Sequence, residues 1–333
     1  MAQVDSETMI LSIIVVNYHS WDKLRNCLDS LTPEHQPAIN LDIIVVDNDP
    51  DDPRMEDFSD DYPNVRFIKN TGNHGFAHGC NSGALLATGS VYLFLNPDTI
   101  VPDGVLEKML ASFMSMRDDA VLSTGKKTTT GKFERIQRFF PKLGMQSGLG
   151  KALHRLVNKR ALAEAFAKDK DIVYPDWVSG SVVMIGQDTF KKIHGWDTRF
   201  WMYSEDADLC QRVRLAGGLI ALNQHIDIIH DHGGSSRINH AVSAMTKSEV
   251  KMSHHVFISK HFSGLRRVFM HTELVIIDTL STSIYALLSL LLFTSSKLKT
   301  KRLLWLNLMK YYLHSIRTRQ WLSPRSIGKD SRI

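Results

Sequence analysis

Three acidic residues, Glu205, Asp206 and Asp208, are crowded into four positions directly behind an aromatic-rich run at 200–203. Neighbouring carboxylates repel each other, so one of them holds its proton more tightly, and aromatic walls that exclude water raise its pKa further. A carboxylate with a raised pKa is suited to take a proton from a hydroxyl group. The segment therefore predicts a general base. It also fits an ordinary helix start with Ser204 as the N-cap, and the segment alone does not decide between the two.

The elements that must position these acids alternate between strands and helices. Continuous apolar runs, typical of buried parallel strands, occupy 9–16, 41–46, 65–68 and 91–95, and helical spacing is found at 21–31 and 81–87. This alternation predicts an α/β fold with a doubly wound, mostly parallel sheet flanked by helices. Ligands of such sheets bind at the carboxyl ends of the strands. The candidate residues at those ends are Asn17, Tyr18, Asp47, Asn48, Asn96 and Asp98.

A glycine-rich loop at 70–83 precedes one of the predicted helices. Its glycines, among them Gly75, allow a backbone to approach a ligand closely, and a helix N-terminus favours anions. The loop matches neither a dinucleotide fingerprint nor a Walker loop, so its spacing alone favours a plain tight turn over nucleotide binding. The pair Asp47 and Asn48 is also ambiguous, since it fits either a turn or the recognition of a pyrimidine edge.

Two segments offer metal ligands. Asp98 follows Asn96 and Pro97 at a predicted strand end, and one carboxylate together with substrate phosphates is typical of a Mg²⁺ or Mn²⁺ site. Turn chemistry alone selects the same three residues. His230 ends a second apolar run at 226–229 and begins the sequence His-Asp-His-Gly-Gly-Ser, which supplies imidazoles for a metal or phosphate contact.

Taken in order, these segments resemble the family 2 glycosyltransferases with the GT-A fold. The closest resemblance is to the rhamnosyltransferase-like branch of bacterial lipopolysaccharide, O-antigen and cell-wall polysaccharide synthesis. The resemblance spans about residues 11–235. It rests on Val-Asn-Tyr at 16–18, Val-Asp-Asn at 46–48, Asn-His-Gly-Phe-Ala-His-Gly-Cys-Asn-Ser-Gly at 73–83, Leu-Asn-Pro-Asp at 95–98, Trp-Val-Ser-Gly-Ser at 177–181, Gly-Trp-Asp at 195–197 and the acidic segment at 200–212.

The resemblance implies roles for individual residues. Asp206 would be the base that deprotonates the acceptor hydroxyl, with Glu205 as its neighbour, and Asp98 and His230 would hold Mg²⁺ or Mn²⁺. Asn96 stands where the fullest version of the metal motif has an acid, so the site has fewer charges. The residues implied in binding the nucleotide sugar are Asn17, Tyr18, Asp47, Asn48, Asn73, Gly75, Phe76, Asn81 and Asn96. Those implied in binding the acceptor are Trp177, Gly180, Trp196, Tyr203 and Arg138.

Charge and hydropathy divide the chain into two predicted regions, a catalytic domain at 9–262 and a helical region at 263–333. From Lys251 onward, Lys and Arg outnumber Asp and Glu by fourteen to three, which favours an anionic partner such as a phospholipid surface. The run 274–293 is apolar, about the length of a membrane span, and basic residues flank both its ends, which favours a helix lying in the membrane surface. A soluble helical subdomain is the alternative. The basic, irregular stretch 126–171 is predicted to be a mobile insertion over the site, and a solvated loop and helix is an equal alternative.

The predicted function is inverting transfer of a sugar, L-rhamnose from dTDP-rhamnose, to a polyprenyl-diphosphate-linked saccharide. We expect the protein at the cytoplasmic face of the bacterial inner membrane, since the acidic N-terminus and short apolar run do not fit a signal peptide. Three separated cysteines suggest neither a disulfide framework nor a zinc site, and no nucleic-acid partner is expected. The alternatives are a UDP-hexose-dependent transferase and a non-catalytic sugar-binding scaffold. A nicotinamide-dependent dehydrogenase is disfavoured, because the first strand ends without the dinucleotide glycines.

Overall fold

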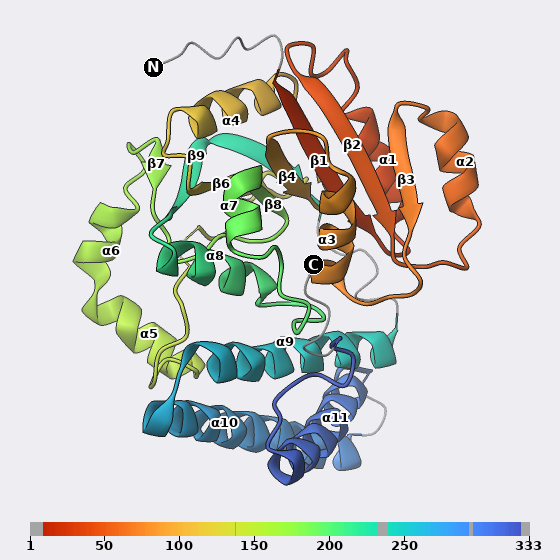
Figure 1. The fold of residues 1–333 in the computed structure, drawn as a ribbon. Coiled ribbons are helices and arrows are strands. Elements are labelled where there is room, and N and C mark those ends of the chain that lie inside the picture. The colour runs from red at the N-terminus through yellow and green to blue at the C-terminus, as the bar shows by residue number, and fades with distance from the viewer. Residues whose placement is uncertain (1–8, 137, 232–238, 293–295, 328–333) are drawn as a thin grey trace.

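The computed structural model describes residues 9–136, 138–231, 239–292 and 296–327 (Figure 1). The described strands form one sheet in the order β3-β2-β1-β4-β8-β6-β9-β5, with β7 paired to β9. The strands are β1 (Ile10–Asn17), β2 (Asn40–Asp47), β3 (Val65–Lys69), β4 (Val91–Leu95), β5 (Thr99–Ile100), β6 (Ala120–Lys127), β7 (Ile172–Val173), β8 (Val182–Gly186) and β9 (Leu219–His230).

Helices cover both faces of this sheet. One hydrophobic core joins the sheet to α1, α2 and α4, and a second core on the other face joins it to α3, α7 and α8. The predicted doubly wound α/β architecture is therefore confirmed. The bounds are α1 (Trp21–Asp29), α2 (Arg54–Asp61), α3 (Phe76–Leu86), α4 (Val105–Met114), α5 (Gly148–Val157), α6 (Lys159–Ala165), α7 (Gln187–Lys192) and α8 (Glu205–Leu215).

The register of the parallel strands brings the predicted ligand-binding residues to one edge. β1 pairs in parallel with β2 and β4, and Asn17 lies opposite Asp47 at the end of the first pair. β8 runs antiparallel to both β4 and β6, so the sheet is mixed on this side. The strand ends after β1, β2 and β4 therefore share the edge at which doubly wound sheets bind ligands.

The C-terminal region is a layer of long helices, α9 (His240–His261), α10 (Gly264–Leu291) and α11 (Ser296–Thr318). Figure 1 shows α9 between the sheet domain and the pair α10 and α11. Phe257 and Val256 of α9 pack against Phe200, whereas Met252 packs against Leu308 of α11. Because α9 contacts both parts, the boundary predicted at residue 262 stays a prediction.

The predicted insertion at 126–171 contains regular structure. It begins in the last residues of β6 and includes α5 and α6, which Figure 1 shows at one side of the molecule, with α5 next to the C-terminal helices. The helix predicted at 81–87 begins earlier, at Phe76. The glycines of the preceding loop weaken its helical pattern, but tertiary packing overrides that local preference.

Candidate active site

The acidic segment enters α8 through a strained turn. Tyr203 and Ser204 both have left-handed backbones, with φ of 71° and 62°. Ser204 makes no side-chain cap hydrogen bond, so the alternative of an ordinary serine-capped helix start is not what the structure shows. Two consecutive non-glycine residues in this region are rare and cost roughly 1–3 kcal/mol each. Such strain is typical of functional sites, where the surrounding structure holds it in place.

Asp206 is held in position by two backbone amides. Its Oδ2 accepts a hydrogen bond from the amide of Gly180 at 3.0 Å, and its Oδ1 accepts one from the amide of Ala207 at 2.8 Å. Burial raises the pKa of Asp206, although the Gly180 amide and the charge of Arg138 oppose the shift. The carboxylate is thus oriented, partly desolvated and still able to ionise, as a general base requires.

The two neighbouring acids have different environments. Glu205 is buried, and no described group hydrogen-bonds its Oε2. Burial, together with the charge of Asp206, raises the pKa of Glu205 well above its ordinary value. Asp208 is also buried, but it lies 2.8 Å from Arg212, 2.6 Å from Lys260 and 2.7 Å from His261, which keep its pKa low. Glu205 is therefore suited to hold a proton, Asp206 to exchange one and Asp208 to anchor α8 to α9.

Asp206 lines a cavity of about 510 Å³. Three predicted acceptor residues line the same cavity: Trp177, Tyr203 and Arg138. The guanidinium of Arg138 lies 4.7 Å from the centre of the Trp177 ring, and the indole nitrogen donates to the carbonyl of Phe139 at 3.1 Å. The structure therefore brings these three side chains to the predicted base.

Trp196 and Asn81 do not take their predicted places as ligand-binding side chains. Trp196 is 1% exposed and packs edge-on against Phe76 and Phe94. The Asn81 amide is used within the protein, since it donates to the Trp196 carbonyl at 2.8 Å and accepts from the Trp196 amide at 2.9 Å. Both predictions are corrected to core residues that fix the segment before α8, because a fully buried ring has no surface left for a sugar.

The glycine-rich loop clamps the acidic segment. Gly75 has φ of 92°, and a Cβ at this position would lie 2.0 Å from the carbonyl oxygen of Trp201. The amide of Phe76 donates to that oxygen at 3.1 Å, and the Trp201 indole donates to the carbonyl of Asn73 at 3.1 Å. The loop and the acidic segment, far apart in sequence, are thus locked together. Gly79 of α3 has a packing role, since a Cβ there would meet the β1 side chains at 2.7 Å.

The strand ends after β1 and β2 contain one unsatisfied acceptor. Asp47 is buried; its Oδ1 accepts from Asn17 at 3.3 Å, but no described group hydrogen-bonds its Oδ2. Burial raises the pKa of Asp47 to about 6. The side-chain amide of Asn48 donates to the carbonyl of Gly75 at 3.2 Å and accepts from Asn70 at 2.8 Å, so Asn48 helps to position the loop. Tyr18 is half-buried and follows Asn17, the residue that lies opposite Asp47 in the pairing of β1 with β2.

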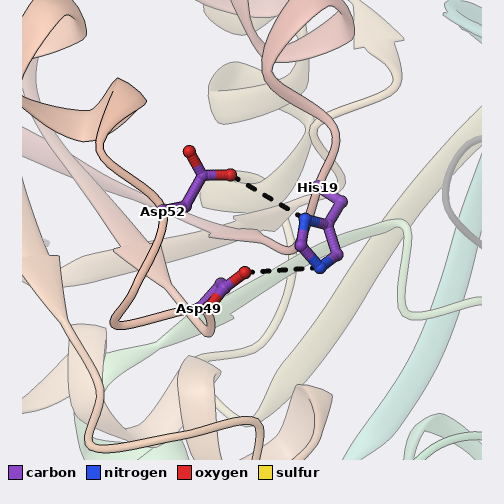
Figure 2. Close-up of side chains that lie close together, drawn as sticks. All are labelled: His19, Asp49 and Asp52. Atoms are coloured by element: carbon purple, nitrogen blue, oxygen red, sulfur yellow. Dashed lines mark ion pairs between the residues drawn. The ribbon is translucent and has the colours of Figure 1, made fainter.

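A cluster not predicted from the sequence lies beside this edge (Figure 2). His19 Nε2 lies 3.3 Å from Asp49 Oδ2, and His19 Nδ1 lies 3.8 Å from Asp52 Oδ2. These three residues have the donor types of a metal site. However, Asp52 Oδ2 already accepts from Trp21 at 2.9 Å and from Arg54 at 2.6 Å. The cluster therefore fits a role in joining the two loops better than a role as an open metal centre.

Asp98 and His230, the predicted metal ligands, are adjacent. Asp98 Oδ1 lies 3.2 Å from His230 Nε2, and Glu134 Oε1 lies 2.6 Å from His230 Nδ1. Burial opposes protonation of His230, but hydrogen bonds to Asp98 and Glu134 outweigh it and raise its pKa. A carboxylate on the far nitrogen is the usual support of a metal-binding histidine. Asp98 and His230 therefore fit a divalent cation, whereas the remainder of the predicted motif, from His232, lies outside the described residues.

Glu134 was missed by the sequence reasoning, although it lies in a stretch noted for its charge. It connects the two halves of the site, because its Oε2 lies 3.5 Å from Arg138, which lines the Asp206 cavity. Lys126 is also buried, and burial lowers its pKa to about 8, although the negative charge of Glu134 acts in the opposite direction. Asn96 is half-buried, and its backbone N–H donates to the backbone carbonyl of Ser181, which joins β4 to the segment around Gly180.

Two protein-family models match the chain. The model described as glycosyl transferase family 2 matches residues 12–170, and the model described as N-terminal domain of galactosyltransferase matches residues 162–240. The chain is 27% identical to rhamnosyltransferase WbbL of Escherichia coli over 62% of this chain and 77% of that protein. It is 22% identical to the N-acetylglucosaminyl-diphospho-decaprenol L-rhamnosyltransferase of Mycobacterium tuberculosis, over 69% of this chain and 78% of that protein.

Solved structures share the fold. The mannosyltransferase PcManGT from Pyrobaculum calidifontis, in complex with GDP-Man and Mn²⁺, aligns with a TM-score of 0.53 and 12% identity over 93% of this chain and 88% of that chain. GalNAc-T7 with UDP, GalNAc and Mn²⁺ aligns with a TM-score of 0.51 and 13% identity over 79% of this chain and 54% of that chain. At 12–13% sequence identity, these two alignments support a shared fold and nothing further. Residues 12–170 of this protein thus match a glycosyl transferase family 2 domain, its fold is that of the GT-A glycosyltransferases, and the proteins similar to it include rhamnosyltransferases.

Proposed function

We propose that the protein transfers a sugar, with inversion, from a nucleoside diphosphate donor to a hydroxyl group of a lipid-linked saccharide. The single observation that carries this proposal is Asp206, a partly desolvated carboxylate held by two backbone amides in the wall of a cavity large enough for a sugar. A base so placed has a clear use in deprotonating an acceptor hydroxyl.

In the proposed step, Asp206 takes the proton while the acceptor oxygen attacks the anomeric carbon. The new bond forms on the face opposite the diphosphate, and the bond from carbon to diphosphate oxygen breaks, which leaves the nucleoside diphosphate. One base and no covalent intermediate give inversion. Glu205 keeps its own proton because its burial disfavours the charged form, and it therefore leaves the role of base to Asp206.

A divalent cation, Mg²⁺ or Mn²⁺, would be held by Asp98 and His230, with Glu134 orienting the imidazole. The ion supplies positive charge that stabilises the departing diphosphate. The protein holds the two ligand atoms, Asp98 Oδ1 and His230 Nε2, 3.2 Å apart, with Asp98 just after β4 and His230 at the end of β9. The choice of Asp98 over the cluster at His19 rests on the hydrogen bonds that already occupy Asp52.

The donor would be dTDP-L-rhamnose, as the names of two relatives suggest. The unsatisfied Oδ2 of Asp47 supports binding of a pyrimidine nucleotide, because the N3–H of thymine or uracil would donate a hydrogen bond to this oxygen. Asn17 and Asn48 hold Asp47 and the glycine loop in place around that position. Thymine and uracil share this N–H, so a UDP-hexose is the alternative donor.

The acceptor would be a saccharide on a polyprenyl diphosphate, the class named for the mycobacterial relative. The C-terminal helices support work at a membrane. Among the described residues, Gly264–Ser289 is long and apolar enough to cross a bilayer, and only 22% of its apolar window is buried. Asp278, on the inner side of α10, is paired with Lys251 and Tyr312. Many of the exposed side chains of α10 are apolar, namely Leu265, Val268, Phe269, Ile276, Leu280, Ile284 and Leu287, and the exposed polar ones include Arg266 and Arg267 near its start.

A helix with one polar, paired face and one apolar, exposed face fits the surface of a membrane better than its interior. We therefore place the protein at the cytoplasmic face of the inner membrane. The test is sedimentation with phosphatidylglycerol vesicles of Leu280→Ser/Ile284→Ser beside the matched control Leu85→Ser/Leu215→Ser. The α10 variant should lose most of its vesicle binding, and equal binding of the two variants would contradict the placement. Removal of the C-terminal helices would be a poorer test, because it would expose Met252 and other apolar side chains that pack against α11.

The function is tested by nucleoside diphosphate release from purified protein with Mg²⁺ or Mn²⁺. dTDP-rhamnose and common UDP-sugars are offered with and without a polyprenyl-diphosphate sugar acceptor. Acceptor-dependent release with one donor would support the proposal and identify that donor. Tight nucleotide-sugar binding without release for any pair would favour a non-catalytic binding protein instead.

A further inference from the structure

The cavity in front of Asp206 is lined by an excess of positive charge. Four basic side chains face it from the segment before α5 and from α5 itself, and Asp206 is the one carboxylate among its described lining residues. The four are Arg135, Arg138, Lys151 and Arg155. A sugar alone offers no negative charge to such a group. The charge therefore indicates an anionic part of a ligand next to the sugar.

These cations have few counter-ions within the protein. In the described part of the chain, no carboxylate pairs with Arg135, Lys151 or Arg155, and Arg138 has Glu134 at 3.5 Å. Burial and the charges of Arg155 and Lys251 lower the pKa of Lys151. Burial and two lysines also lower the pKa of His254, another lining residue, to about 4. Like charges in a half-enclosed space repel, and a bound anion would relieve that repulsion.

Helix α5 shows which source of anion fits. Lys151 and Arg155, one turn apart, face the cavity, whereas Leu149, Leu153 and Leu156 on the opposite side are 82%, 59% and 71% exposed. The segment before α5 is tied to α10, because the carboxylate of Glu273 accepts from the amides of two residues, at 2.9 and 3.2 Å. The start of α5 is thereby held next to α10.

The residues assigned to the nucleotide lie elsewhere. Neither Asp47 nor the pair Asp98 and His230 lines this cavity. An anion bound here would thus be separate from the donor diphosphate, and it would lie between the base and the cationic side of α5, with the apolar side of that helix facing away from the cavity. A sugar linked to a prenyl diphosphate matches this arrangement, with the sugar at one end, two phosphates in the middle and a hydrocarbon chain at the other end.

We propose that Arg135, Arg138, Lys151 and Arg155 bind the diphosphate of a prenyl-linked acceptor, with its sugar hydroxyl toward Asp206 and its chain leaving along the apolar side of α5. This inference rests on the proposed function, and it adds the anchor that selects a lipid-linked substrate over a free sugar. The volume of about 510 Å³ is of the size that holds a hexose and two phosphates. The helix thus acts as a bridge between the membrane surface and the base.

The test is equilibrium binding of farnesyl diphosphate to the full chain in detergent, with farnesol as the uncharged probe. The double variant Arg135→Gln/Arg155→Gln is compared with Lys159→Gln/Arg160→Gln, which removes two exposed cations that do not line the cavity. Each lost charge-assisted contact should weaken binding about tenfold. We expect the first variant to bind farnesyl diphosphate about 100-fold more weakly than wild type, and the control to bind as wild type does. Equal loss in both variants, or no loss in the first, would overturn the proposal.

A second arm separates the lipid diphosphate from the nucleotide diphosphate. Saturating UDP and dTDP should leave farnesyl diphosphate binding unchanged, and displacement by either nucleotide would overturn the proposal by assigning the cations to the donor. Nucleoside diphosphate release is measured on the same preparations. If farnesyl diphosphate binds as expected but no donor is consumed with any acceptor, the transferase assignment fails and the subsite stands. If transfer occurs at equal rates in wild type and in the double variant, the subsite fails and the transferase assignment stands. Thermal unfolding of each variant checks that it is folded.

Discussion

Replacing Glu205 by Gln tests the idea that the acidic segment stores unfavourable electrostatics. Glu205 is buried, its Oε2 has no hydrogen-bond partner among the described groups, and Asp206 and Asp208 lie beside it in sequence. Ionising this carboxyl therefore opposes folding. Gln keeps the shape of the side chain and has no charge to bury.

The pH dependence follows from the direction of the shift. Because the pKa of Glu205 is raised in the folded state above its ordinary value of 4.5, its stabilising contribution is fully present below about pH 4.5. That contribution is lost as the pH rises toward the folded pKa. The variant has no such dependence, so it should gain on the wild type as pH increases. At pH 8 the carboxyl is ionised in the unfolded chain and must take up a proton, or bury its charge, on folding; Glu205→Gln avoids this cost and should gain about 1–3 kcal/mol.

The assay is urea unfolding of wild type and Glu205→Gln at pH 4.5 and pH 8. The two free energies of unfolding should nearly coincide at the lower pH and differ at the higher pH in favour of the variant. A wild type that is the more stable protein at pH 8 would refute the reasoning, because it would show that the Glu205 carboxylate is stabilised in the fold. A difference that does not change with pH would refute it as well.

The remaining predictions concern the loop and the metal. Gly75→Ala should destabilise the protein by more than about 3 kcal/mol in urea unfolding, because its Cβ would overlap a carbonyl oxygen at 2.0 Å. Gly104→Ala, also at positive φ but with nothing within 4 Å, should cost only about 1 kcal/mol, and similar costs at both sites would contradict the clamp. Asp98→Ala should raise the half-saturating Mg²⁺ or Mn²⁺ concentration by about 10–100-fold, whereas Asp49→Ala should leave it unchanged. The reverse pattern would move the metal to the cluster at His19.

Much of the fold could be predicted because its strands are nearly continuous apolar runs. β1, β2, β3 and β4 lie within one or two residues of their predicted positions, and the parallel pairing of β1 with β2 follows from their burial on both faces. The mixed direction of the sheet could not be read in this way. β8 pairs antiparallel on both sides, and that pairing depends on contacts between segments about ninety and sixty residues apart.

Site residues could be predicted where the residue type itself indicates a chemical role. They could not be predicted where tertiary packing decides whether a side chain is exposed. Asp98 and His230 are adjacent, and Asp206 meets Arg138 and Trp177 at one cavity. Their positions at element ends and in an acidic cluster made them candidates. Trp196 and Trp177 have the same side chain, yet Trp196 lies in the core and Trp177 lines the cavity. Their exposure depends on tertiary contacts, which cannot be read from the sequence.

The loop and the basic stretch show the same limit. The sequence showed glycines and predicted a close approach of backbone, but the partner is the carbonyl of Trp201, more than a hundred residues away, and no ligand is needed to explain it. The basic stretch at 126–171 is predicted from the sequence to be a mobile insertion over the site, and its mobility stays a prediction. Its cations do line the cavity beside Asp206, but Glu134, which links them to His230, has no motif of its own.

Asp206→Asn gives the most direct test of the central claim. The exchange keeps the size of the side chain and removes its capacity to take a proton, so acceptor-dependent nucleoside diphosphate release should fall by about 10²–10⁴-fold. Binding of the donor, measured by calorimetry on the same preparation, should stay within about twofold of wild type, because Asp206 lines the cavity proposed for the acceptor. A variant that still transfers sugar at the wild-type rate would remove Asp206 from the role of base and contradict the account.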